Sequence, residues 1–389
     1  MARVSGSFIN TTTLGETVRA FVPHPLPPAE PPLSPLSYET QNRAAEMALG
    51  RLSAVCGLVP SVEWLIYSAV RKEALLTSQI EGTEASLTDL FDQEAGIEIS
   101  NRDDVEEVTN YMRAFRMVRN NLGDAHGLPL SVRLICEAHR VLLAGARGAS
   151  KQPGEIRRSQ NWIGATRPGN AVFVPPPAEK IPELLGDLER LIHSEPAQLP
   201  PLVLIALIHA QFETIHPFLD GNGRIGRLLI TALLEHWHLL REPLLYLSGY
   251  LKRNQTQYYR LLSATRTEGN WEAWVDFFLV GVAEAAAEAE RNVIDVATLV
   301  AADRRRLLAS PKAGSAAFRL FELLPTMPRF TVEKVRQELS TSFPTANAAV
   351  KLLDELGIVT EMTGQRKNRT FSYQRYIELL ARVDERIPQ

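Results

Sequence analysis

The sequence has few cysteines, little net charge and no long apolar run. Only two of its 389 residues are cysteines, Cys56 and Cys136, and their spacing matches no zinc or redox motif. Both lie in apolar, helical-looking stretches, so we expect buried thiols in a reducing compartment. The longest apolar runs, residues 201–210 and 228–234, are shorter than a membrane span, and no signal-peptide pattern is visible. These features predict a cytoplasmic protein that does not enter a membrane.

The charge balance excludes two further classes of protein. The net charge is −3, and the fractions of charged residues (22%) and hydrophobic residues (45%) are those of an ordinary globular protein. For the chain as a whole, neither a strongly basic nucleic-acid binder nor an acidic disordered tail is indicated. The length suffices for two or three domains.

The hydrophobic pattern predicts a mainly helical protein in three regions. Residues 1–125 begin with a proline-rich run, 23–35, where extended or loop structure fits, and they turn helical from Tyr38 onward. In this first region, a helix over about 62–82 ends at Gly82, a residue suited to a left-handed cap.

The second region, residues 126–305, is predicted to contain helices and one turn-rich segment. The segment spans about 155–177, and its two strand-like pieces predict a β-hairpin flap. The third region, residues 306–389, combines three helical patterns with two strands around a basic turn, which is the pattern of a winged helix. The helices expected in the second region cover about 130–144, 178–193, 201–214, 224–240, 255–267 and 271–305.

The segment His216–Arg227, with the sequence HPFLDGNGRIGR, has the character of an anion site. Its glycines let the backbone approach a ligand closely, and they open an apolar helix. The free N–H groups of a first helical turn bind anions, and the helix dipole assists them. Arg224 and Arg227 lie in that turn, where the dipole disfavours cations, so a bound polyphosphate would explain them.

Two residues ahead of the glycines add reactive chemistry. Asp220 can hold Mg²⁺ on bound phosphates, because Mg²⁺ keeps several waters and takes few protein ligands. His216 has an ordinary pKa of about 6.5, so it can take a proton from a hydroxyl near neutral pH. Together with the anion site, these residues form a set suited to phosphoryl or nucleotidyl transfer.

Two other interpretations of the segment stay open. Residues 221–226 also satisfy the dinucleotide pattern G-x-G-x-x-G, and Glu242 follows about 20 residues later. That site needs the glycines directly after a buried strand, whereas residues 212–220 intervene here. The segment could instead be a glycine-rich turn between two core helices, with solvated arginines.

The segment resembles the signature of the Fic family, H-P-F-x-[D/E]-G-N-G-R-x-x-R, at every fixed position. The helices before it, the flap and the C-terminal module are similar to those of long bacterial members. The resemblance implies a Fic-type helical bundle with a hairpin flap. It also implies a protein adenylyltransferase, which uses ATP and Mg²⁺ to move AMP onto a Ser, Thr or Tyr hydroxyl of a protein.

Carried over by position, the resemblance assigns roles within the segment. His216 is the residue that deprotonates the incoming hydroxyl, and Asp220 is the residue that holds Mg²⁺. The phosphate-binding residues that it implies are Gly221, Asn222, Gly223, Arg224, Ile225, Gly226 and Arg227.

Roles outside the segment follow from the same resemblance. Ile163 and Gly164 lie in the flap, which positions the target segment. Tyr258 and Tyr259 resemble a pair that contacts the nucleoside in some members, with plain helix packing as the alternative. Arg266 stands where some relatives carry an asparagine that reads adenine.

A second motif concerns inhibition. Residues 77–82, TSQIEG, resemble the family's inhibitory motif [S/T]-x-x-x-E-[G/N], with Thr77, Glu81 and Gly82 at the fixed positions. A glutamate at a helix C-terminus is disfavoured by the dipole, and a cationic partner would offset this. The resemblance implies Arg227 as that partner, which would keep it from the γ-phosphate of ATP. An exposed surface glutamate is the alternative.

Partners and competing activities remain open at this point. The expected partner is a target protein, with self-modification as a further outcome. The alternatives are a nucleotide-responsive transcription regulator that uses the winged helix, and a Fic enzyme that removes AMP or transfers another nucleotide. Gly223 favours AMP transfer, because the family's kinase-like variant departs at this position. The wing offers only Arg366, Lys367 and Arg369 for DNA, so protein docking or a homodimer fits this module equally well.

Overall fold

The computed structural model describes residues 3–145, 149–194, 199–365 and 369–382. At its centre lies α7 (Pro201–Ile215), a helix in which every residue after Pro201 is buried. A helix that is apolar on all sides is stable only inside a protein core. Its neighbours are α6 (Ile181–Ile192), α8 (Asn222–His236), α10 (Gln255–Thr267) and α11 (Trp271–Leu308). The segment His216–Arg227 therefore connects two core helices, α7 and α8.

A second group of helices packs beside α8. Within this group, α2 contacts both α4 and α9, and α4 contacts both α5 and α8. The C-terminal ends of α2 and α7 both lie at the start of α8, because Glu81 pairs with Arg227 and α7 leads into α8. The group consists of α2 (Val62–Ile80), α3 (Leu87–Glu94), α4 (Arg102–Gly123), α5 (Val132–Leu142) and α9 (Ser248–Arg253).

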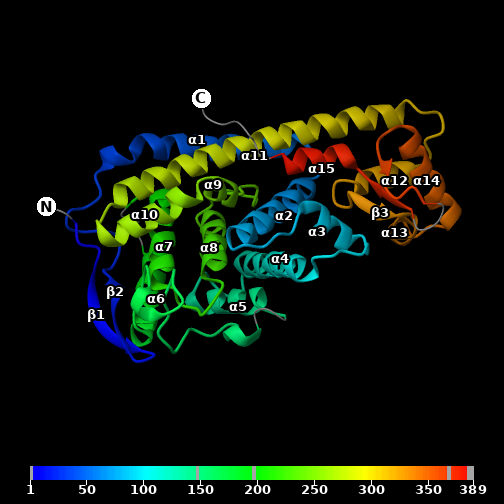
Figure 1. Ribbon diagram of the computed structural model, residues 1–389. Helices are drawn as coiled ribbons and strands as arrows, with labels where there is room; N and C mark the ends of the chain where they lie inside the picture. The colour runs from blue at the N-terminus through cyan, green and yellow to red at the C-terminus, as the bar shows by residue number, and fades with distance from the viewer. Residues whose placement is uncertain (1–2, 146–148, 195–198, 366–368, 383–389) are drawn as a thin grey trace.

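The longest helix, α11, joins the two ends of the molecule. It runs along one side of the bundle beside α1 (Glu39–Val55) and extends to the C-terminal elements at the far end (Figure 1). It passes the predicted boundary at residue 305 without a break and ends at Leu308. The division into three regions, with boundaries after residues 125 and 305, stays a prediction.

A two-stranded hairpin stands at the end opposite the C-terminal elements (Figure 1). Its strands, β1 (Gly6–Thr13) and β2 (Glu16–Pro23), pair antiparallel around Leu14 and Gly15, which both have positive φ. Such a two-residue turn matches the twist of the strands, and asparagine or glycine usually opens it. Because leucine stands at its first position, the turn lacks the usual sequence signal, and these strands were not predicted.

The flap lies beside this hairpin. The strand-like pieces expected around residues 162–163 and 172–174 meet at a single antiparallel bridge, Ile163 with Phe173. The hairpin supports the flap because the Phe21 N–H donates to the carbonyl of Val174 at 2.9 Å. Two more flap residues, Trp162 and Ala171, pack against the small apolar cluster that the hairpin and flap share.

The C-terminal part contains the elements expected there and two more. Its three-stranded antiparallel sheet has the order β3–β5–β4, and the sequence analysis missed β3 and α15. Of the wing cations, Arg369 donates to Asn347 at 2.9 Å, whereas Arg366 and Lys367 lie outside the described residues. The winged-helix assignment stays a prediction. The elements are α12 (Ser315–Leu323), β3 (Arg329–Thr331), α13 (Val332–Glu338), α14 (Phe343–Glu355), β4 (Thr360–Glu361), β5 (Thr370–Ser372) and α15 (Gln374–Ala381).

The predicted fold class is confirmed: the protein is mainly helical, and strands are confined to small sheets. The helix over 62–82 ends where expected, with Gly82 at a φ of 96°. Both bounds of α8 differ from the expected 224–240, because the helix begins at Asn222 and ends at His236, and the short helix α9 was not expected. In the described part of the chain, no helix has the combined length and apolar character needed to cross a bilayer.

Candidate active site

The turn between α7 and α8 is held by its own side chains. His216 caps α7 in the left-handed conformation, with φ 50° and ψ 62°. Asn222 accepts from the Phe218 N–H and donates to the Phe218 carbonyl, both at 2.8 Å. Because both polar atoms of its side chain contact Phe218, we expect Asn222 to contact a phosphate mainly through its backbone N–H. That N–H belongs to the first turn of α8, where donors lack acceptors within the helix.

His216 lies in a cationic, mostly buried setting. Burial lowers the pKa of His216 to about 3, and the guanidinium groups of Arg157 and Arg266 push in the same direction. The backbone of Glu213 and the carboxylate of Glu81 offset this only in part. The imidazole is therefore neutral at neutral pH and has a lone pair available to accept a proton.

Asp220 is held by its backbone carbonyl and by one oxygen of its carboxylate, which accepts from the Gly221 N–H and lies 3.8 Å from Nη2 of Arg224. The carbonyl of Asp220 accepts from Nε2 of His139 at 3.1 Å, while Nδ1 of His139 accepts from the Gly154 N–H at 2.9 Å. The ring of His139 stacks on Phe218 with centroids 3.8 Å apart. Burial lowers the pKa of His139 to about 4, so it braces the loop as a neutral ring. The Asp220 carboxylate stays about half exposed.

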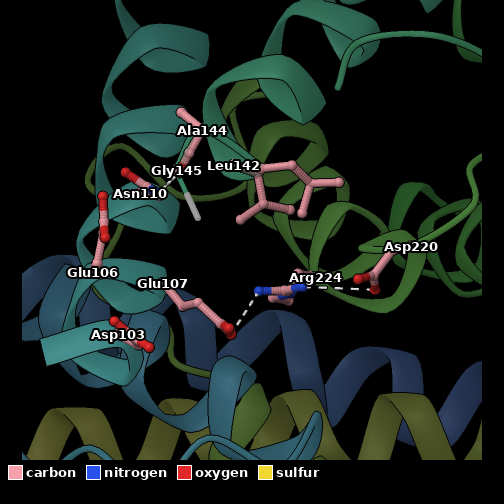
Figure 2. Close-up of a pocket in the computed structure, with 10 residues that line it drawn as sticks. Asp103, Glu106, Glu107, Asn110, Leu142, Ala144, Gly145, Asp220 and Arg224 are labelled. Atoms are coloured by element: carbon pink, nitrogen blue, oxygen red, sulfur yellow. Dashed lines mark hydrogen bonds and ion pairs between the residues drawn. The ribbon is translucent and has the colours of Figure 1, made fainter. Parts of the chain in front are cut away.

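Arg224 pairs with a carboxylate that the sequence analysis did not single out. It is buried, and its Nη1 lies 3.1 Å from Oε2 of Glu107 on α4. Figure 2 shows Arg224 between Glu107 and Asp220, at the edge of a small pocket that Asp103 and Glu106 also line. A bound polyphosphate would have to compete with Glu107 for this arginine.

Arg227 is fully engaged by α2. Its guanidinium donates to Oγ1 of Thr77 at 2.6 Å, to the Thr77 carbonyl at 3.1 Å and to the Glu81 carboxylate, with which it forms an ion pair. Burial works against both charges, but their attraction outweighs it, so the pKa of Glu81 is lowered and that of Arg227 is raised. A Cβ atom at Gly223 would collide with the Glu81 carboxylate. Glu81 therefore touches the first turn of α8, where an anion would bind.

Two family models match the chain in this region: the Fic/DOC family N-terminal model over residues 40–119, and the Fic/DOC family model over residues 129–234. The chain belongs to the Fic/DOC family. The second match contains the whole turn between α7 and α8, and the first contains α2.

Curated relatives in this family carry the name protein adenylyltransferase Fic. The protein from Drosophila ananassae is 27% identical over 210 residues, which cover 52% of this chain and 38% of that protein. The protein from Drosophila grimshawi is 28% identical over 207 residues, or 51% of this chain and 38% of its own. The chain thus spans 38% of the length of these relatives. Their names support an enzyme of the Fic transferase type.

Solved structures show the same fold. A Fic family protein from Desulfovibrio desulfuricans G20 superposes with a TM-score of 0.55 at 21% identity, covering 87% of this chain and 96% of that one. Fic-1 from C. elegans superposes with a TM-score of 0.51 at 21% identity, covering 67% of this chain and 72% of that one.

Of three residues that the Fic resemblance implied, Tyr258, Ile225 and Tyr259, the first two are placed away from an open site. Tyr258 is buried, with its hydroxyl 2.9 Å from Nε2 of His209 and its ring beside Trp274, as in ordinary helix packing. Ile225 is also buried and faces the core. Tyr259, by contrast, is 47% exposed. A nucleoside contact from this pair would have to come from Tyr259.

The flap and α10 close the other side of the site. Ile163 is half-buried at the flap's bridge, and Gly164, exposed with a φ of 81°, leaves room for Val172. Arg266 lies over the ring of Phe173 at 4.0 Å and donates to Thr214 at 3.1 Å. Its guanidinium is thus held between the flap and the end of α7.

Sequence reasoning missed four residues that shape this Fic site. Glu107 pairs with Arg224, and His139 braces Asp220. Arg157 donates to the His216 carbonyl at 2.9 Å, and Glu213 is a buried carboxyl group beside Gly226. No sequence pattern distinguishes these residues from others of the same type. Arg157, for example, directly precedes Arg158, which is exposed. Only the packing of separate elements distinguishes them.

Proposed function

We propose that this chain is a protein adenylyltransferase that moves AMP from ATP to a Ser, Thr or Tyr hydroxyl of a protein, and that α2 inhibits it. The observation that carries the proposal is the engagement of Arg227 by Glu81 at the anion-binding end of α8. Such a pairing keeps a phosphate-binding arginine from contacting the phosphates of ATP. The names of the curated relatives support the type of reaction and ATP as substrate.

In the proposed reaction, the neutral His216 imidazole takes the proton of the target hydroxyl. The hydroxyl oxygen forms a bond to the α-phosphorus of ATP, the bond from that phosphorus to the bridging oxygen breaks, and pyrophosphate leaves. The first-turn N–H groups of Asn222 and Gly223 stabilise the developing charge. Arg224 and Arg227 engage the outer phosphates, as guanidinium groups commonly do.

The donor set fits one Mg²⁺ ion held jointly with the nucleotide. Asp220 offers a half-exposed carboxylate, of which Oδ1 accepts from the Gly221 N–H at 2.6 Å. In the described residues, no group of three or more acidic, histidine or cysteine side chains forms a ready metal cage. A single carboxylate with phosphate oxygens and waters is a common Mg²⁺ environment. When bound there, Mg²⁺ would neutralise part of the phosphate charge.

Inhibition follows from the position of Glu81. Its carboxylate lies against Gly223 and repels a phosphate at the first turn of α8. It also holds Arg227, whose side chain is 2% exposed and so cannot reach a γ-phosphate. ATP would then bind in a pose that does not favour transfer.

Labelling with α-³²P-ATP and Mg²⁺ tests the proposal. We expect Glu81→Gly to raise protein labelling at least tenfold, and His216→Ala in the same background to abolish it. Glu84→Gly, at an exposed glutamate three residues on, is the matched control and leaves labelling at the wild-type level. Labelling that survives His216→Ala would refute the mechanism, and release of AMP from a modified protein instead would favour the reverse activity. Mass spectrometry of labelled proteins then identifies the target.

A further inference from the structure

We propose that Arg157 is a positioning residue for AMP transfer: it ties the backbone of His216 to both ends of the flap and places a positive charge beside the imidazole. The inference rests on the proposed function, since it assigns a task to Arg157 in that same reaction. It concerns a residue outside the His216–Arg227 segment and outside the α2 motif.

The side chain of Arg157 joins three stretches of chain. Nε donates to the carbonyl of His216 at 2.9 Å, Nη1 to Ser159 at 2.9 Å and Nη2 to Pro176 at 2.6 Å. Its own N–H donates to the carbonyl of Pro217 at 2.9 Å. Ser159 and Pro176 lie at the two ends of the flap. One guanidinium therefore sets the distance between the flap and the turn that carries His216.

Arg157 is an unusual buried cation. It is 1% exposed, and in the described part of the chain no ion pair joins it to a carboxylate. Burial lowers its pKa to about 10, which Glu179 offsets in part, so the group remains charged at neutral pH. Buried arginines are normally paired, because an unpaired charge loses its hydration. Here carbonyl dipoles replace the missing carboxylate, and the net positive charge remains in the site.

The turn at His216 needs such support. A non-glycine residue rarely adopts a positive φ, and His216 does so directly before Pro217. The His216 N–H is held by the Phe212 carbonyl at 3.0 Å, and its carbonyl is held by Arg157. With both sides of the residue fixed, the backbone that carries the ring is held in one place relative to the flap.

The charge of Arg157 acts on the protonation of His216. Four groups face the ring: Arg157 from the base of the flap, Arg266 from α10, Glu81 from α2 and the Glu213 backbone from α7. Arg157 makes the largest charged contribution to the lowered pKa of His216, after burial itself. Removal of Glu81 during activation would lower that pKa further, whereas removal of Arg157 would raise it.

The test uses the full-length chain in the Glu81→Gly background. We expect Arg157→Met to lower kcat at least tenfold while the KM for ATP changes by less than threefold, because Arg157 contacts the turn and the flap rather than the phosphates. Arg157→Lys keeps the positive charge but cannot make the three hydrogen bonds of the guanidinium group, so its kcat should lie between those of Arg157→Met and the parent. Arg158→Met is the matched control, since its side chain is 85% exposed and its loss should leave kcat unchanged.

A second readout separates positioning from simple loss of fold. The pKa of the His216 imidazole can be followed by NMR in the protein without ATP, where no turnover occurs. We expect this pKa to be higher in Arg157→Met than in the parent, and to equal the parent value in Arg157→Lys. A fall in kcat without that shift, a shift without a fall in kcat, or a proportional rise in the KM for ATP would each overturn the proposal. The NMR titration needs no turnover, so it tests the effect of Arg157 on His216 separately from the adenylyltransferase activity, and the failure of one can be told from the failure of the other.

Discussion

At the scale of single residues, Glu213 is a buried carboxyl group that the proposed reaction does not use. It lies three residues before His216, it is 8% exposed, and its Oε1 has no hydrogen-bond partner among the described residues. A Cβ atom at Gly226 would collide with this oxygen, so glycine there leaves room for the carboxyl group. Burial raises the pKa of Glu213 to about 7, although Arg227 opposes the shift.

This raised pKa predicts a pH-dependent cost to stability. The folded value lies above the ordinary value of 4.5, so ionisation becomes unfavourable as the pH rises from about 4.5 to 7, and the cost is complete above the folded pKa. The difference in unfolding free energy between Glu213→Gln and the wild type should therefore shift in favour of the variant by about 2 kcal/mol when the pH is raised from 5 to 8. Urea unfolding at each pH measures this. A difference that stays constant with pH would contradict it, and Glu183→Gln, at an exposed glutamate, is the control.

At the scale of elements, α2 and its C-cap present a polar side chain every four residues along one face, of which the first two are buried and the last is 35% exposed. Glu73 accepts from the Ser248 N–H at 3.1 Å at the start of α9, Thr77 accepts from Arg227, and Glu81 ends the row. On another face, Lys72 donates to Glu288 of α11 at 3.2 Å. A rotation of α2 would break several buried polar contacts together, which is costly. We therefore expect Glu81 to be released by a local change, either a rotation of its own side chain, which is 35% exposed, or unwinding of the last turn of α2.

Replacing Thr77 should give a protein whose inhibition is intermediate between that of the wild type and that of Glu81→Gly. Thr77→Val keeps the shape of the side chain but removes the acceptor for Nε of Arg227. A buried donor left without a partner costs about 1–3 kcal/mol, and 1.4 kcal/mol corresponds to about tenfold in rate. We expect the labelling rate to rise severalfold to about tenfold, to a level below that of Glu81→Gly. Thr77→Ser should behave like the wild type. Labelling at the wild-type level in Thr77→Val would show that Glu81 alone holds the arginine.

At the scale of the whole molecule, α11 carries the C-terminal elements (Figure 1). The attachment centres on Asp303, which is fully buried. Its carboxylate accepts from the Tyr373 hydroxyl at 2.9 Å and from Arg375 at 2.7 Å, and both of these residues flank or belong to α15. A further ion pair, Arg329 with Asp92 at 2.9 Å, joins β3 to α3. The C-terminal elements thus contact both the long helix and the helices next to α2.

Removing the buried carboxylate of Asp303 should strongly lower the local stability of the C-terminal elements. Asp303→Ala leaves the Tyr373 hydroxyl buried without its partner, and we expect a local destabilisation of about 2–4 kcal/mol. Hydrogen exchange followed by mass spectrometry should show lost protection in residues 315–323 and 343–355. Glu322→Ala is the control, because it breaks the largely exposed pair with Arg304, which contributes about 0–1 kcal/mol. Equal protection in the two variants would contradict this account of the attachment.

Most helices were predictable from the sequence, because their apolar spacing and end signals are local. The helix over 62–82, the buried α7 and the exact run of α10 followed from such patterns. The hairpin β1–β2 was missed, because its turn lacks the usual residues, and α15 was missed, because it is short and follows a strand directly. The strands of the flap reduce to one bridge, since a run of prolines, Pro175–Pro177, follows them and offers no N–H donors.

The sequence by itself determined the turn His216–Arg227, including its glycines, its reactive histidine and the helix that follows. Neighbouring residues in a tight turn are placed by their own backbone, so their order in the chain already encodes their geometry. Only the tertiary structure decided which other groups reach that turn. The Fic resemblance implied the contact of Glu81 with Arg227, across 146 positions, whereas nothing in the sequence indicated that Arg157 reaches His216 across 59. Contacts of that kind depend on how α2, the flap and α8 pack together, and no local spacing records them.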